Sequence, residues 1–239
     1  SLTTNNPLPS TGGKGGDTIE EIRQNTLSLV ASQKRSVTPE DYLIRALSMP
    51  SDFGSISKAC IEKPKLTDEQ ISTIETLSLY VLSFNSNNQL DYAGETLKNN
   101  LKTYLSQYRM IGDSIEIRDA YIINIAINFE IIVLPNFNNN KVLSACISLL
   151  KGVFNINQFD LKQPIFIRNL YVLLDRVEGV QTVKNIEIFN KSGLLSGYSQ
   201  YSYDIEAATQ NQVIYPSLDP SIFEIKYPDQ DIKGRVVPL

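Results

Sequence analysis

The chain has 239 residues, of which 42% are hydrophobic and 20% are charged, the balance of a globular protein with a buried core. Its 22 Lys and Arg residues and 26 Asp and Glu residues leave a net charge of −4, which argues against a nucleic-acid-binding protein. The longest apolar-leaning run, residues 121–135, contains Asn124, Asn128 and Glu130 and is too short to cross a bilayer. We therefore expect neither nucleic acid nor a membrane as a partner.

Residues 1–16 are predicted to form a flexible linker, because Gly and Pro residues there prevent a stable element. The glycine run around Lys14 is similar to a phosphate-binding loop, but that motif needs Ser or Thr where Gly15 stands, and no strand precedes it. The chain begins with Ser1 rather than Met and has no apolar leader. This start indicates a piece of a longer protein or a processed product.

Residues 17–112 are predicted to form a first small α+β domain. An acidic start at Asp17 and a helical period predict a helix to about residue 33. Thr38 and Pro39 begin a second helix, and the helix dipole explains the acidic residues of its first turn without acid–base catalysis. The other expected elements are strands at 56–62 and 77–84 and a helix at 93–109, with the domain boundary near Gly112.

Residues 113–190 are predicted to form a second small α+β domain. Seven consecutive odd positions from Tyr121 to Val133 are apolar, which predicts a long strand with one face on a core. A shorter strand is expected at 114–119. Helices at 142–153 and 165–176 and a strand at 182–189 follow, so the chain should form a strand-helix-helix-strand unit with a long antiparallel strand.

Residues 191–239 are predicted to form an extended arm with short strands. The segment is polar, rich in Tyr, Ser and Gly, and interrupted by prolines. Aromatic side chains are common in protein interfaces, so this segment supplies the candidates for contact with a partner, although a strand with aromatic residues on one face is the alternative. The candidates are Tyr198, Tyr201, Tyr203, Tyr215 and Phe223.

The residue types that are missing or isolated exclude several kinds of site. The chain has no histidine, so Ser-His-Asp and Cys-His nucleophile pairs and His-ligated metal sites cannot occur. Cys60 and Cys146 lack zinc or redox spacing; we expect two free thiols, and a long-range disulfide is the alternative. Asp229 and Asp231 lack the other oxygen ligands of a calcium loop. We therefore expect no metal site, no cofactor and no catalytic residue.

The order of several short motifs resembles the baseplate J-like family, which comprises baseplate wedge proteins of contractile-tailed phages and related injection machines. Residues 35–42 (Arg-Ser-Val-Thr-Pro-Glu-Asp-Tyr) carry the family signature. A glycine-rich entry at 12–17 precedes it, and residues 178–183 (Glu-Gly-Val-Gln-Thr-Val) close the second domain. The similarity covers about residues 11–190.

The last residues resemble the carboxyl end of the T-even-type wedge ring proteins. The similar segments are 213–224 (Val-Ile-Tyr-Pro-Ser-Leu-Asp-Pro-Ser-Ile-Phe-Glu) and 231–237 (Asp-Ile-Lys-Gly-Arg-Val-Val). The resemblance implies a structural virion protein, made late and assembled in the host cytoplasm. It further implies that the protein forms a homodimer and joins other wedge proteins in the ring around the tail hub. It carries over no catalytic residue.

Two other functions remain as alternatives. A host-surface adhesin would bind glycans or a receptor through the tyrosines at 198–203. A carboxylate-based cell-envelope hydrolase would show a deep cleft with an acidic side chain of raised pKa, whereas a structural protein would show broad contact surfaces. We favour the structural protein.

Overall fold

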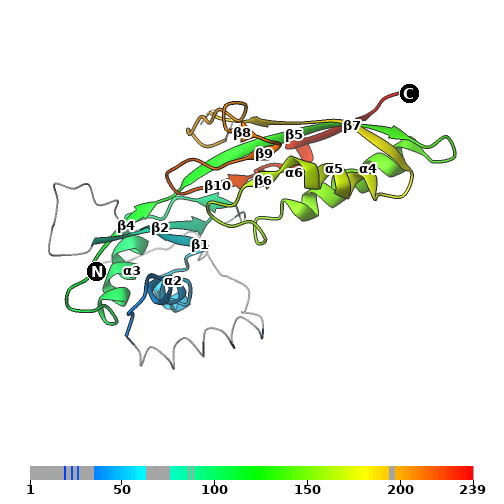
Figure 1. Cartoon of the computed structure of the whole chain (residues 1–239). Coiled ribbons are helices and arrows are strands. Elements are labelled where there is room, and N and C mark those ends of the chain that lie inside the picture. Colours follow the sequence, from blue (N-terminus) through cyan, green and yellow to red (C-terminus); the bar gives the residue numbers. More distant parts are fainter. Residues whose placement is uncertain are drawn as a thin grey trace, which may run out of the picture. The chain divides into compact units, whose positions relative to one another are not determined.

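The computed structural model describes residues 19, 23, 26, 35–62, 76–85, 87, 89–193 and 197–238. The chain divides into two compact units, unit 1 up to Ala120 and unit 2 from Tyr121 onward (Figure 1). Each unit combines helices with a β-sheet, so the expected α+β class is confirmed. The linker at 1–16, its glycine run and the helix at 17–33 lie outside the described residues, except that positions 19, 23 and 26 are helical.

The sheet of unit 1 is built around one central strand, β2. Its strands are β1 (Lys58–Glu62), β2 (Thr76–Phe84), β3 (Leu90–Asp91) and β4 (Ser114–Asp119). β2 pairs antiparallel with β1 and β3 and parallel with β4. Its four consecutive residues 79–82 are all buried, as expected for a strand that is covered on both faces. Helix α3 (Glu95–Ser106) leads the chain back to the parallel β4.

Helix α2 (Pro39–Leu47) begins at the cap that the sequence predicts. The Thr38 hydroxyl accepts a hydrogen bond from the backbone N–H of Asp41 at 3.2 Å, and the Asp41 carboxylate accepts one from the backbone N–H of Thr38 at 2.9 Å. This reciprocal pair satisfies N–H groups that a helix start otherwise leaves unpaired. α2 and α3 pack on the unit 1 sheet around a core of Ala46, Met49, Leu79, Val81, Leu101 and Leu105. A short 3-10 turn (Ser51–Phe53) follows α2.

The structure divides the chain at Ala120 rather than near Gly112. All six residues of β4 pair with β2, from Ser114 opposite Thr76 to Asp119 opposite Val81, so β4 completes the sheet of unit 1. From the sequence alone, this strand was expected in the second domain. Its bounds agree with the prediction, but alternation of apolar and polar residues identifies a strand without identifying the strand that it pairs with.

Unit 2 is built around the predicted long strand, β5 (Tyr121–Val133). It pairs antiparallel with β7 (Val180–Asn190) and parallel with β10 (Ser221–Glu224) and β11 (Ile232–Val236). β7 and β11 pair with the same stretch of β5 and therefore lie on its opposite edges. Two register shifts along β7 leave Lys184 and Gln181 as extra residues. A small third sheet joins β6 (Ile165–Phe166), β8 (Thr209–Gln210) and β9 (Val213–Ile214).

Helices α4 (Asn139–Val153) and α5 (Ile167–Asp175) cover one face of the unit 2 sheet (Figure 1). The odd-numbered side chains of β5 from Ile123 to Ile131 are at most 1% exposed, which confirms the core face that the alternation predicts. Gly234 of β11 has no space for a side chain, because a Cβ there would meet Phe129 of β5 and Leu143 of α4. The strand-helix-helix-strand order is therefore present as β5, α4, α5 and β7.

Residues 191–238 are an integral part of unit 2. The sequence analysis predicted an extended arm with short strands, and the short strands are present. Two of them, β10 and β11, extend the main sheet by pairing with β5, and a short helix, α6 (Pro228–Asp231), connects them. All four residues of β10 are buried. The segment thus supplies strands to the core sheet.

Candidate interaction surfaces

Four tyrosines of unit 2 lie together at the surface. The ring centroid of Tyr201 is 4.6 Å from that of Tyr121 and 6.3 Å from that of Tyr203, with which it is stacked. The Tyr203 hydroxyl donates a hydrogen bond to the carbonyl of Tyr215 at 2.7 Å. Tyr121 is 37% and Tyr215 is 49% exposed, while Tyr201 and Tyr203 are half-buried. We call these four residues the tyrosine surface; the sequence analysis named all of them except Tyr121, which it assigned only to a strand.

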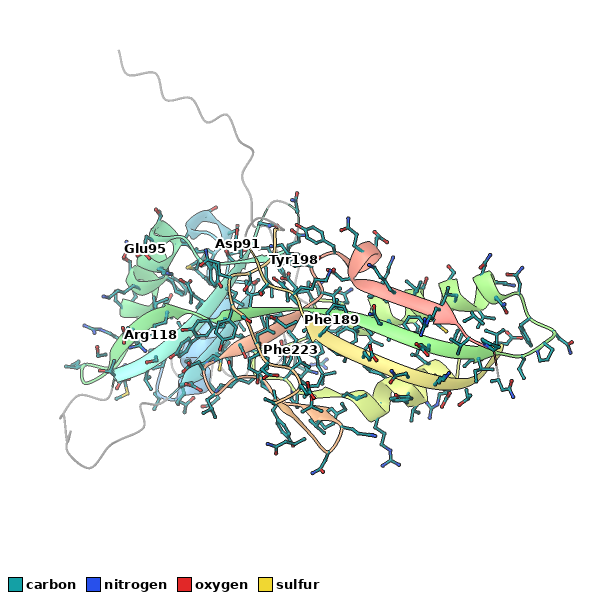
Figure 2. All side chains as sticks on the ribbon, turned by 90° about the horizontal axis from the view of Figure 1, so that it is seen from above. Asp91, Glu95, Arg118, Phe189, Tyr198 and Phe223 are labelled. Atoms are coloured by element: carbon teal, nitrogen blue, oxygen red, sulfur yellow. The ribbon has the colours of Figure 1, made fainter. Side chains whose placement is uncertain are left out.

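Tyr198 and Phe223, both labelled in Figure 2, are buried side chains of unit 2. Phe223 is 1% exposed, pairs with Ile123 of β5 and has its ring centroid 6.2 Å from that of Tyr203, and Tyr198 is 8% exposed. Both are among the packed side chains of unit 2, where they stabilise the fold. Partner contact remains a prediction for Tyr201, Tyr203 and Tyr215, whose side chains reach solvent. Composition alone could not separate the two groups, because aromatic residues are common both in cores and in interfaces.

A buried carboxylate, Asp231, fastens the last segment of the chain. It accepts hydrogen bonds from the Tyr198 hydroxyl at 2.6 Å and from the backbone N–H of Tyr227 at 3.0 Å, and the Lys191 ammonium lies 3.7 Å away. Burial, together with the hydrogen bond to Asp231, raises the pKa of Tyr198, so the phenol stays a neutral donor. Asp229 is exposed and forms an ion pair with Lys151. The two aspartates therefore serve separate partners.

A second buried network holds residues 197–203 against β5. The backbone N–H of Ser199 donates to the Asn124 side-chain oxygen at 2.7 Å, and the Asn124 amide donates to Glu224 at 2.8 Å. The Ser199 hydroxyl donates to the carbonyl of Ile122 at 2.6 Å. Buried polar groups that are satisfied in this way fix one packing arrangement, because any other would leave them unpaired. The base of the tyrosine surface is therefore rigidly positioned.

A second exposed surface lies in unit 1, after the end of α3. Met110 is 45% and Ile111 is 105% exposed, and Val37, which follows the Ser36 that is hydrogen-bonded to Tyr108, is 59% exposed. Met110 directly follows Arg109, which lines a small pocket of about 130 Å³ between α3 and β4 together with Lys102, Leu105, Ser106 and Ile115. We call these eight residues the α3–β4 surface. The sequence signal that marks it is a pair of large apolar residues directly before Gly112, in an expected turn.

The cysteines and carboxylates that the sequence singled out do not form a disulfide or a metal site. Cys60 and Cys146 both carry thiols, and burial raises the pKa of the Cys146 thiol to about 11. Within the described ranges, no three Cys, Asp or Glu side chains gather in a way that could hold a metal ion. In that same part of the chain, every helix is too short or too polar to cross a membrane.

Comparison with known proteins adds a likeness of fold. No family model and no curated protein matches the sequence. Nineteen chains of solved structures match the fold, among them a chain of the cryo-EM structure of the anti-feeding prophage (AFP) baseplate, 6-fold symmetrised. The match has a TM-score of 0.54 and 12% identity, and covers 91% of this chain but 44% of that one. The chain thus spans less than half the length of the baseplate chain, and shares its fold.

Proposed function

We propose that the protein is a structural component of the baseplate of a contractile phage-like tail. The observation that carries the proposal is the likeness of fold to a chain of the anti-feeding prophage baseplate, which extends over 91% of this chain and thus over both units. The order of motifs that resembles the baseplate J-like family supports the same role independently. Two lines of evidence, one from the backbone and one from short sequence motifs, point to one kind of assembly.

In this role, the protein forms a homodimer and joins other wedge proteins in the ring around the tail hub. Exposed apolar side chains on both units suit such contacts, because their burial against a partner is favourable. In unit 1 they belong to the α3–β4 surface. In unit 2, Tyr215 is 49% and Leu218 is 90% exposed. A component that contacts several neighbours needs several such surfaces.

Light scattering after size exclusion, over a hundredfold range of protein concentration, tests self-association. We expect a mass near twice 26.8 kDa at the highest concentration and a shift toward the monomer on dilution. Tyr215→Ser should move the shift to higher concentration. Val172→Ser, which removes a side chain of similar exposure (43%) from α5, is the matched control. A monomer at every concentration would reject the homodimer and leave the baseplate role standing.

Location in the particle tests the baseplate role itself. Antibodies raised against this chain should label one end of purified contractile tail particles from the source cells, at the end that carries the baseplate. Mass spectrometry of the same particles should find the chain in a fixed ratio to the tube and sheath proteins. Particles that lack the chain, or label along the sheath, would reject the proposal.

Host-surface binding is the second candidate, and the tyrosine surface favours it. Partly exposed, stacked tyrosine rings are suited to sugar rings as well as to proteins, because both present flat apolar faces. A glycan array probed with the labelled chain distinguishes the two functions. Specific glycan binding that Tyr201→Ala and Tyr215→Ala abolish would favour an adhesin, and absence of such binding favours the structural role.

A further inference from the structure

The turn after α3 is held in place by hydrogen bonds from α2 and from the segment that precedes it. The backbone N–H of Ser36 donates to the carbonyl of Tyr108 at 2.8 Å. The Tyr42 hydroxyl accepts from the backbone N–H of Met110 at 3.3 Å and donates to the Asp113 carboxylate at 2.6 Å. Tyr42 is 1% exposed, so the turn has a buried anchor. The exposed apolar side chains of this turn are therefore presented on a fixed backbone.

The apolar side chains of this turn and of Val37 are largely exposed. Ile111 is 105% exposed, more than in an extended chain, and Met110 and Val37 are about half exposed. An isolated exposed apolar residue is ordinary, but Met110 and Ile111 expose two consecutive large apolar side chains on one turn, and burial by a partner would be favourable for both. A fixed backbone reduces the entropy that such binding costs.

The pocket next to the turn combines an apolar floor with a positive rim. Lys102, Leu105 and Ser106 lie on one face of α3, Arg109 follows in the turn after the helix, and Ile115 of β4 also lines the pocket. Leu105 is 0% exposed and forms the floor, whereas Lys102 and Arg109 are exposed. The volume, about 130 Å³, suits a side chain and not a whole small-molecule ligand.

The exposed cations that line the pocket are Lys102 and Arg109, although the whole chain carries a net charge of −4. The Arg109 guanidinium also donates a hydrogen bond to the backbone carbonyl of Asp113 at 3.2 Å. Two further arginines lie on α2 and before it. The guanidinium of Arg45, only 4% exposed, lies 3.9 Å from the ring centre of Tyr108, the residue before Arg109. Its Nη2 atom has no hydrogen-bond partner among the described residues. Arg35 is exposed and directly precedes Ser36. The nearest carboxylate on the turn, Asp113, is engaged by Tyr42.

We propose that the α3–β4 surface binds an acidic segment of another protein, in which carboxylates flank a large apolar side chain. The carboxylates pair with Lys102 and Arg109 at the rim of the pocket, and the apolar side chain packs against Met110 and Ile111. Charge complementarity favours a partner with negative charge. The exposed apolar side chains favour a protein segment over a polyanion that has no apolar groups. Binding of this kind would occur in unit 1 whether or not the chain is a baseplate component.

Fluorescence anisotropy with the full chain tests the charged part of this surface. The probe is a short fluorescein-labelled peptide in which glutamates flank a leucine and a phenylalanine. We expect Lys102→Glu with Arg109→Glu to weaken its binding by about tenfold or more, since two attractive pairs become repulsive. Lys141→Glu with Lys184→Glu, two exposed cations of unit 2, makes the same change in net charge and should alter binding by less than about twofold. Far-ultraviolet circular dichroism checks that each variant is folded.

A second matched pair of variants tests the apolar part of the α3–β4 surface. Ile111→Ser should weaken binding of the peptide by about fivefold, since an isoleucine loses part of its burial energy. Leu218→Ser, which removes a side chain that is 90% exposed in unit 2, should leave binding unchanged. A peptide with serines in place of leucine and phenylalanine should bind the unaltered chain as weakly as the original peptide binds Ile111→Ser.

Three results would overturn the inference. One is equal binding of the acidic peptide and of a peptide with lysines in place of its glutamates. Another is an equal effect of the charge reversals in unit 1 and in unit 2. The third is tighter binding of a DNA oligonucleotide or of anionic lipid vesicles than of the peptide, without any effect of Ile111→Ser, which would make the surface a general anion-binding one.

Discussion

Gly234→Ala is expected to destabilise unit 2, because β11 has no space for a side chain at this position. A Cβ on Gly234 would lie 2.3 Å from Cζ of Phe129 and 2.7 Å from Cδ1 of Leu143, whereas carbon atoms in contact are usually about 3.5–4.0 Å apart. The Phe129 ring would have to move by about 1 Å, and it is itself 1% exposed in a packed core. Inserting a methyl group into such a core lowers the free energy of unfolding by about 1–3 kcal/mol.

The buried thiol of Cys146 provides an assay that reports on unit 2 alone. In a Cys60→Ser background, Cys146 is the single thiol; it is 0% exposed, so a thiol reagent reaches it only when the core opens. A loss of 1–3 kcal/mol increases the open fraction, and hence the labelling rate, by roughly 5- to 150-fold. Gly152→Ala is the matched control: it lies in α4, and a Cβ there has no atom within 4 Å.

Comparison of the Gly234→Ala and Gly152→Ala variants distinguishes the effect of lack of space from the general effect of adding a methyl group. In α4, replacement of Gly by Ala raises helix propensity, so Gly152→Ala should leave the labelling rate unchanged or lower it. If Gly234→Ala labelled no faster than the parent, the packing of β11 against Phe129 and α4 described above would be wrong. Equal acceleration by both variants would likewise show that space at Gly234 is not the cause.

Three other predictions concern caps, pH and chain length. Thr38→Ala removes the acceptor of the Asp41 N–H bond and should lower the free energy of unfolding by about 1 kcal/mol, measured in urea. Burial, and then its hydrogen bond to Asp113, raises the pKa of Tyr42 to about 12, above the value of 10.0 in the unfolded chain. The contribution of Tyr42 to the free energy of unfolding should therefore be intact below pH 10 and decrease between pH 10 and about 12. Tyr42→Phe should reduce that fall in alkaline urea titrations, and an unchanged pH dependence would contradict it. Deletion of residues 191–239 removes β10 and β11 from the sheet of unit 2. In limited proteolysis, unit 2 of the shortened chain should be cleaved while unit 1 stays resistant. Equal resistance of both units would contradict the integral role of this segment.

The sequence predicts single elements well where one physical signal dominates. The bounds of β4 and β5 agree with the predictions to the residue, because apolar side chains recur at every second position along each strand. The start of α2 was equally clear, since Thr38, Pro39 and the acidic first turn all indicate a helix start at one place. By contrast, α3 was predicted at 93–109 and spans Glu95–Ser106, because apolar periodicity continues into the turn after the helix.

Contacts between residues that are far apart in the sequence could not be predicted from these local signals. Asn124 lies on β5 as a polar exception to an apolar strand, and only the fold shows that Ser199 and Glu224 satisfy it. The Tyr198 hydroxyl is satisfied in the core because Asp231, 33 residues later, accepts its hydrogen bond. Local sequence carries no signal for such pairs, so the candidate contact residues could be named from the sequence but not sorted into core and surface.

The structural role of residues 191–238 follows from the backbone of β5. Each residue of a strand has one N–H and one C=O, and the buried ones must be paired. Even-numbered residues of β5 such as Ile122 and Ala126 are as deeply buried as the odd-numbered ones, so β5 is a central strand that needs partners on both edges. The strand-helix-helix-strand unit supplies β7 for one edge only. The second partner has to come from another part of the chain, and β11 at residues 232–236 provides it. A long buried strand needs a partner strand on each edge. When the neighbouring segments supply only one, we therefore expect a segment that looks like a terminal arm to supply the other.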